Sequence, residues 1–110
     1  MSRTFDANPY YSPEKCGLIL VGVLEDPDAS YDFSTVIVAK DVETGKLYAA
    51  HDSGCSCPTP FESINSLDAM TQIASLSDLD RFIADVPYTR YEYNDRVKLL
   101  DAVRDELTST

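Results

Sequence analysis

The sequence is short of basic residues. Nine lysines and arginines stand against nineteen aspartates and glutamates, which gives a formal net charge of −10 at pH 7. Binding to a nucleic-acid backbone depends on Lys and Arg side chains that displace counterions, and docking on anionic lipid needs the same side chains. We therefore expect neither nucleic acid nor a membrane among its partners, and a basic protein is the partner that this charge favours.

A long hydrophobic run is missing as well. The longest apolar stretch, Cys16 to Leu24, is much shorter than the ~20 residues that a membrane-spanning helix requires. Residues 1–15 show no positively charged start followed by an apolar core, so we expect no targeting segment and a cytoplasmic protein. The odd number of cysteines (Cys16, Cys55 and Cys57) argues against a disulfide scaffold, and a cytosol would keep the three thiols reduced.

The length of 110 residues is that of one ordinary domain. No repeat, low-complexity tract or linker divides the chain. Pro9 and Pro13 keep the first residues extended, so the sequence predicts an irregular N-terminal arm over 1–15 and a single α+β domain over 16–110.

Three strands are predicted in the first half. The continuous apolar run 17–24 is typical of a strand covered on both faces, and 31–40 and 46–51 are rich in β-formers. Turn residues at 25–30 and 41–45 separate them, and such short connections imply an antiparallel meander. Residues 70–74 are predicted to form either a short fourth strand or an extended crossing.

Two helices are predicted in the second half. Ser75 or Ser77 caps the first, which has one apolar stripe and ends before Pro87. The spacing of Thr89 and Glu92 is that of a capping box for the second. The stripe of the first helix consists of Leu79, Phe82, Ile83 and Val86, and that of the second of Tyr93, Val97, Leu100, Val103 and Leu107. The predicted fold is an α+β domain: a three- to four-stranded antiparallel meander with two C-terminal helices packed on it.

The most specialised stretch is Asp52–Glu62, called here the Cys/Pro segment. Gly54 relaxes its backbone while Pro58 and Pro60 stiffen it, and functional residues concentrate on such loops. We predict a binding loop in which Phe61 plugs the core. Its residues are Asp52, Ser53, Gly54, Cys55, Cys57, Pro58, Pro60, Phe61 and Glu62.

Two other chemistries stay open for this segment. Thiolate and imidazole are ligands that Zn²⁺ selects, so His51, Cys55 and Cys57, with Cys16 if the first and third strands are neighbours, form a candidate zinc site. Alternatively, Cys55 or Cys57 is the nucleophile of a thiol enzyme, with His51 as base and Asp52 orienting the imidazole. The recognition loop requires the fewest assumptions.

The eleven residues D-S-G-C-S-C-P-T-P-F-E, which follow a predicted hairpin, resemble a motif of small acidic proteins from tailed phages of actinobacteria. The similarity covers roughly residues 17–85 and includes the Ser66-Leu67-Asp68 stretch. It implies an accessory protein of phage or prophage origin in the host cytoplasm, and it implies no particular activity.

Together these features predict a non-enzymatic protein-binding module with no catalytic residue and no obligatory cofactor. Its partner is expected to be a host or phage protein, and the oligomeric state stays open. A zinc-stabilised domain is the first alternative and a thiol-dependent enzyme the second.

Overall fold

The fold is a four-stranded antiparallel sheet with a different layer on each face. The computed structural model describes residues 4–5, 7–25, 32–55, 61, 64, 66–86 and 91–108. The strands follow one another in the sheet in chain order. They are β1 (Leu18–Glu25), β2 (Asp32–Asp41), β3 (Leu47–Cys55) and β4 (Thr71–Ile73).

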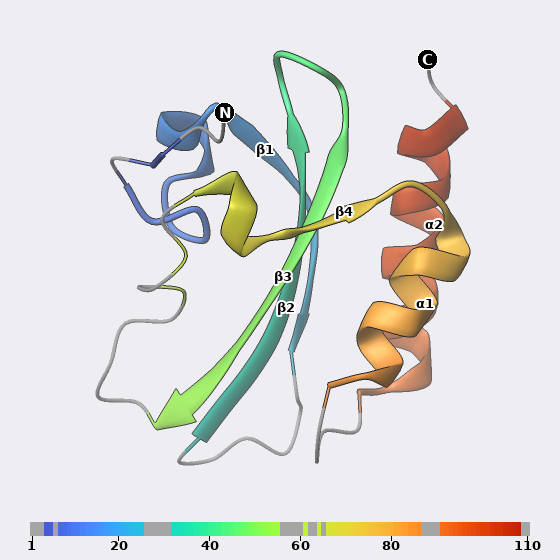
Figure 1. Cartoon of the computed structure of the whole chain (residues 1–110). Coiled ribbons are helices and arrows are strands. Elements are labelled where there is room, and N and C mark those ends of the chain that lie inside the picture. The colour runs from blue at the N-terminus through green and yellow to red at the C-terminus, as the bar shows by residue number, and fades with distance from the viewer. Residues whose placement is uncertain are drawn as a thin grey trace.

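Two α-helices, α1 (Leu76–Ala84) and α2 (Tyr93–Thr108), cover one face of the sheet (Figure 1). The N-terminal arm with the 3-10 helix η1 (Pro13–Cys16) covers the other face, together with the short 3-10 helix η2 (Leu67–Ala69). This architecture confirms the predicted α+β meander with two C-terminal helices. No helix among the described residues is long and apolar enough to span a membrane.

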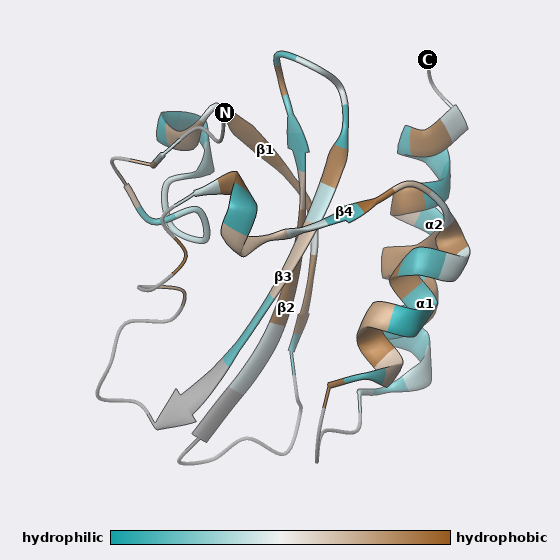
Figure 2. Ribbon diagram, in the orientation of Figure 1, coloured by the Kyte–Doolittle hydropathy of each residue, from teal (hydrophilic) through white to brown (hydrophobic). Residues whose placement is uncertain are grey.

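Each face of the sheet has its own core, because successive strand residues point to opposite sides. The helix-side core consists of Leu24, Val36, Val38, Leu47, Ala49, Ile73, Leu79, Ile83, Leu99 and Val103. The arm-side core consists of Phe5, Cys16, Leu18, Ile37, Ala39, Ala50, Phe61 and Met70. Figure 2 shows that the hydrophobic residues of both α-helices lie toward the sheet.

The arm belongs to the packed structure. Phe5 and Pro9 are buried, and Thr4 forms an isolated antiparallel bridge with Ser66. The predicted boundary between residues 15 and 16 falls inside η1, and Cys16 at the end of this helix lies in the arm-side core. The arm therefore contributes apolar side chains to the domain that was predicted to begin after it.

The prediction that 17–24 is covered on both faces is wrong. β1 is an edge strand, with Ile19 55% and Val23 38% exposed. The pairing with β2 shifts between Leu20 and Gly22, so Leu20 faces the arm side whereas Leu24 faces the helix side. This bulge at Val21 inverts the alternation and allows consecutive apolar residues in a half-covered strand.

The start of α1 is as predicted. Ser75 is its N-cap and accepts a hydrogen bond from the Asp78 amide at 3.2 Å, while the Asp78 carboxylate accepts one from the Ala74 amide at 3.0 Å. The first bond satisfies an amide of the first turn, and the second holds the residue that precedes the N-cap. Leu79 and Ile83 are the buried residues of its predicted stripe.

The buried face of α2 agrees with the prediction in part, since Val103 is fully buried and Leu100 and Leu107 pack against the helix-side core. Leu99 and Val103 are its buried residues, whereas Tyr93 is 76% exposed. The helix begins at Tyr93, which places Glu92 before its first turn, and Thr89 lies outside the described residues.

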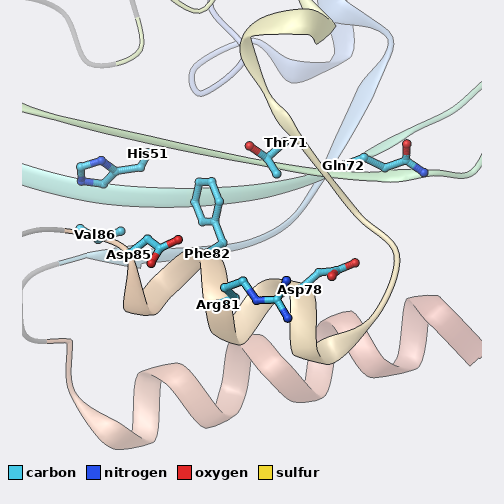
Figure 3. A pocket seen from close by; sticks show the side chains of 8 residues that line it. All are labelled: His51, Thr71, Gln72, Asp78, Arg81, Phe82, Asp85 and Val86. Atoms are coloured by element: carbon cyan, nitrogen blue, oxygen red, sulfur yellow. The ribbon is translucent and has the colours of Figure 1, made fainter.

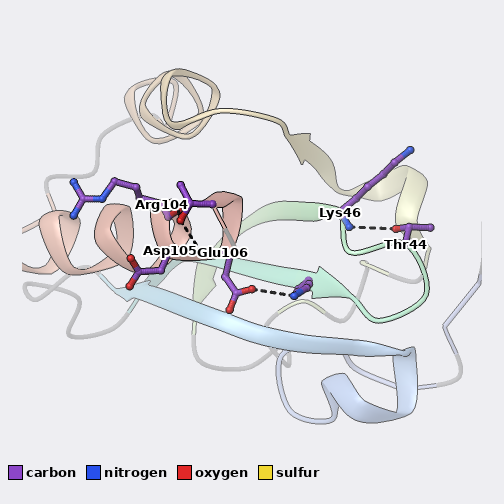
Figure 4. Close-up of polar contacts among 7 residues, drawn as sticks. Thr44, Lys46, Arg104, Asp105 and Glu106 are labelled. Carbon is purple, nitrogen blue, oxygen red and sulfur yellow. Dashed lines mark hydrogen bonds and ion pairs between the residues drawn. The ribbon is translucent and has the colours of Figure 1, made fainter. Parts of the chain in front are cut away.

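An ion pair of 3.1 Å between Lys40 Nζ and Glu106 Oε2 connects β2 to α2 (Figure 4).

The turn between β2 and β3 is held by Asp41, which is 2% exposed. Its carboxylate accepts hydrogen bonds from the Glu43 amide at 3.2 Å and the Thr44 hydroxyl at 2.9 Å. Thr44 Oγ1 in turn accepts from the Lys46 amide at 3.3 Å (Figure 4), and Gly45 supplies the positive φ of 76°. The predicted glycine turn at 41–45 is confirmed.

Leu99 reaches the sheet at Gly22. A Cβ on Gly22 would lie 2.5 Å from Leu99 Cδ1, and Leu99 is only 3% exposed, so its methyl group could move only if the helix-side core repacked. Gly22 has no side chain, so the bulged strand β1 leaves room for Leu99 at this point. The buried stripe of α2 is therefore centred on Leu99.

We expect Gly22→Ala to lower the free energy of unfolding by about 1–3 kcal/mol, the usual cost of overpacking. Urea unfolding measures this loss, and in a Leu99→Ala background the same change should cost much less because the obstructing methyl is gone. Gly45→Ala is the matched control: nothing lies within 4 Å of its added Cβ, so its cost comes from the left-handed backbone and should not respond to Leu99→Ala. An equal cost of Gly22→Ala in both backgrounds would contradict this packing.

Candidate functional site

The Cys/Pro segment begins inside the sheet. β3 was expected to end at His51, yet it continues through Cys55, and its pairing with β2 extends to Asp32 opposite Cys55. Backbone pairing with β2 thus outweighs the local preference of Ser53 and Gly54 for turns. The first four residues of the segment, Asp52 to Cys55, belong to strand β3. The loop is therefore shorter than the predicted range 52–62.

The far end of the segment is fixed by Phe61. Its side chain is fully buried in the arm-side core, which confirms its expected role as a core plug. Its φ of 63° lies in the left-handed region, which is strained for a bulky residue. The Asp52 carboxylate accepts a hydrogen bond from the Phe61 amide at 2.7 Å, and this charge-assisted bond helps to hold the strained backbone.

Tyr10 connects this anchor to the arm and to β1. Its ring stacks on that of Phe61, with centroids 5.3 Å apart and planes 16° apart. Its hydroxyl donates to Glu25 Oε1 at 2.8 Å. Burial, and then the hydrogen bond to Glu25, raise the pKa of Tyr10 to about 12, so the phenol keeps its proton and its hydrogen bond even above the ordinary tyrosine pKa of 10.

The Cys/Pro segment is therefore fixed at both ends. Pairing with β2 holds the chain as far as Cys55, and Asp52 with Tyr10 holds it again at Phe61. Cys57, Pro58, Pro60 and Glu62 lie outside the described residues. Of the predicted binding loop, the structure brings Asp52 and Phe61 into direct contact.

Two of the four proposed zinc ligands, Cys16 and His51, lie on opposite faces of the sheet, and Cys57 lies outside the described residues. β2 lies between β1 and β3, so the first and third strands are not neighbours. Cys16 lies in the arm-side core, where its Sγ donates to the Ala7 carbonyl at 3.3 Å, whereas His51 pairs with Val36 on the helix side. The sheet separates these two residues, and the described residues contain no group of three or more candidate metal ligands.

Among the described residues the proposed thiol-enzyme groups are also apart, while Cys57, the other proposed nucleophile, lies outside these residues. Asp52 bonds to Phe61 on the arm side, so this carboxylate does not orient the imidazole of His51 on the helix side. Cys55 is four residues beyond His51 in the same strand, which separates their Cα atoms by about 13 Å at the usual rise per residue. A nucleophile and its base must lie within hydrogen-bond reach.

His51 instead joins a polar cluster at the edge of the helix-side core. Its Nε2 lies 3.0 Å from Ser34 Oγ, which lies 3.3 Å from the hydroxyl of Tyr91. Burial lowers the pKa of His51, and the nearby Asp52 charge offsets part of this shift. The imidazole is thus mainly neutral at pH 7.

A pocket of about 510 Å³ opens between β3, β4 and α1 (Figure 3). β4 pairs with β3 only at Leu47, Tyr48 and Ala49, so His51 lies beyond the part of β3 that β4 pairs with. The lining residues of the pocket are His51, Thr71, Gln72, Asp78, Arg81, Phe82, Asp85 and Val86. The sequence identified Phe82 and Val86 as part of an apolar stripe. It did not predict that they line a cavity, because the length of β4 depends on the tertiary structure.

We expect Asp52→Ala to lower the free energy of unfolding by about 1.5–3 kcal/mol, because it leaves the amide of a buried residue without its charged acceptor. Urea unfolding measures the effect, and Asp101→Ala serves as control because it removes a surface ion pair with Arg104, whose loss costs at most about 1 kcal/mol. Asp52→Asn retains an acceptor oxygen and should lie between wild type and Asp52→Ala. Equal stability of Asp52→Ala and wild type would refute the anchor.

His51 should make stability depend on pH in a defined direction. Since its pKa in the folded state is below the ordinary value of 6.5, the unfolded chain binds more protons as the pH falls through 6.5. The free energy of unfolding should therefore fall from pH 7.5 to 5.5, and His51→Gln should remove this part of the slope. Urea titrations of wild type and His51→Gln at several pH values measure this difference in slope. If the free energies of unfolding of the two proteins changed in parallel with pH, the imidazole would not be desolvated.

Comparison with curated proteins gives no match, and neither does comparison with solved structures. A family model, described as Domain of unknown function (DUF7574), matches residues 7–110. The match includes both ends of the Cys/Pro segment, the pocket and all but the first residues of the arm. The chain belongs to the DUF7574 family.

Proposed function

We propose that this chain is a non-enzymatic protein-binding module that presents the Cys/Pro segment to its partner. The observation that carries the proposal is the double anchoring of this segment, by the β2–β3 pairing up to Cys55 and by the Asp52–Phe61 bond. Only residues 56–60 lie between these fixed points. Anchoring residues that already hold their positions need not be ordered on binding, which favours affinity.

The residues of the segment divide into two roles in this proposal. Asp52 and Phe61 hold the ends, because the first accepts the Phe61 amide and the second is buried. Cys57, Pro58 and Pro60 form the contact, together with Glu62. Strain at Phe61 is consistent with such a role, since strained backbone persists where surrounding contacts compensate for it and is common at binding sites.

The partner proposed is a host or phage protein with a basic surface, in the host cytoplasm. The net charge of −10 would accelerate encounter with such a surface, and this acceleration weakens as salt screens the charges. The similarity of the motif to small actinobacteriophage proteins supports the phage setting. The zinc and thiol-enzyme alternatives gain no support from the described residues, because His51, Cys16 and Asp52 do not share one side of the sheet.

The test is affinity capture from actinobacterial lysate with two immobilised proteins: wild type, and a variant with residues 56–60 replaced by Gly-Ser-Gly-Ser-Gly. The anchors are retained in both, so circular dichroism should show the same fold. We expect a specific protein on wild type at low salt and its loss on the variant, with Asp105→Lys as a control for nonspecific charge effects. Equal capture by wild type and the loop variant would overturn the proposal.

A further inference from the structure

The outer edge of β1 presents an apolar surface to solvent. β1 is the first strand of the sheet and pairs with β2 on one side, and no strand of the described residues pairs with Leu18–Leu24 on the other. Ile19 is 55% exposed, and Gly22 is partly exposed, which for a glycine means exposed backbone. Strand edges of this kind carry amide and carbonyl groups that another strand can bond.

This edge lacks the charged side chains that commonly prevent strands of two molecules from pairing. Residues 16–24 contain no charged residue, although the chain as a whole has a net charge of −10. The residue opposite Ile19 on β2 is Lys40, and its ammonium group is paired with Glu106. The edge is therefore an uncharged strip on a strongly acidic protein.

The bulge at Val21 limits the regular part of the edge. Leu18, Ile19 and Leu20 pair with consecutive residues of β2, and the register shifts only after them. Residues directly opposite in an antiparallel pair point to the same face, and Lys40 reaches α2, so Ile19 lies on the helix side. Leu18 and Leu20 face the arm-side core.

A second copy of this chain fits the edge better than the basic partner proposed above. An uncharged edge offers a basic segment no electrostatic attraction, whereas two chains of equal charge repel each other least where both are apolar. Antiparallel pairing about a twofold axis at Ile19 sets Ile19 opposite Ile19 and Leu18 opposite Leu20. Every such pair lies on one face of the sheet, so the edge is self-complementary, as a twofold dimer requires.

We propose that two copies of this chain form a dimer by antiparallel pairing of Leu18–Leu20 of β1, with the two Ile19 side chains in contact across the twofold axis. The two four-stranded sheets would join into one continuous sheet. β2 separates β1 from β3, in which the Cys/Pro segment begins, so the dimer does not depend on the proposed function. A contact of this length predicts a weak dimer whose population rises with protein concentration.

The first test is sedimentation velocity over a concentration range of about 5 to 500 µM. We expect wild type to pass from monomer to dimer, and Ile19→Lys to weaken the dimer at least tenfold, because a lysine on a strand edge opposes pairing. Val42→Lys is the matched control. Val42 is 57% exposed in the turn after β2, on the side of β1 away from the free edge, and its substitution should change the affinity less than twofold.

Both positions are exposed, so urea unfolding should show similar stability for the two variants. A wild type that stays monomeric over the whole range would overturn the proposal. Equal weakening by Ile19→Lys and Val42→Lys would also overturn it, because added charge and not the β1 edge would then explain the effect.

Salt gives a second test. Raising the salt concentration from about 50 to 500 mM should strengthen the dimer, since screening reduces the repulsion between two acidic chains. Binding of a basic partner should respond in the opposite direction. A dimer that weakens as salt is added would show attraction between unlike charges and would overturn pairing through the uncharged edge.

A cysteine at the axis tests the register. In a background with Cys55→Ser and Cys57→Ser, Ile19→Cys should form a covalent dimer on oxidation with copper phenanthroline, because directly opposite residues have Cα atoms about 4.5–5.5 Å apart, which a disulfide can span. Val23→Cys is the control: it lies beyond the bulge on the same strand, is also exposed, and has no counterpart across this axis. Crosslinking at Val23 in place of Ile19 would overturn the proposed pairing.

Discussion

Burial of the centre of β2 on both faces is the constraint on which the rest of the structure depends. Val36, Ile37, Val38 and Ala39 are all fully buried, and they alternate between the helix-side and arm-side cores. Both outer layers are therefore needed, because removal of either would expose half of an apolar strand to water. The two helices provide one cover, and the arm, with Phe61 and Met70, provides the other. The anchored end of the Cys/Pro segment is thus part of the cover that β2 requires.

Features governed by local chemistry were predicted from the sequence. Runs of β-formers separated by short polar turns specify a meander, and the Ser75 cap with its following stripe specifies α1. Features governed by contacts between distant residues were not. The bulge at Val21 inverts the facing of β1 through its register with β2, and the burial of Leu99 depends on the missing side chain of Gly22. Neither relation is visible in a window of neighbouring residues.

The candidate site divides in the same way. The sequence identified the Cys/Pro segment and the plugging role of Phe61, which follow from composition. It could not assign sides of the sheet, and for this reason His51 was grouped with Asp52 and Cys16. Strand alternation places Asp52 with Phe61 and leaves His51 with Ser34 and the pocket. The sequence did not reveal that β3 continues through Gly54. This extension results from the pairing of β3 with β2.

The division into two cores has a consequence for the chain as it leaves the ribosome. Every described residue of the arm-side core precedes Thr71, so these residues are synthesised before the two α-helices. The helix-side core needs Leu99 and Val103, close to the C-terminus, and is completed last. During synthesis the sheet would first gain its arm cover while its other face stays exposed, and a nascent chain with exposed apolar surface is prone to aggregate. The helix side of the sheet therefore lacks part of its cover until α2 has been synthesised.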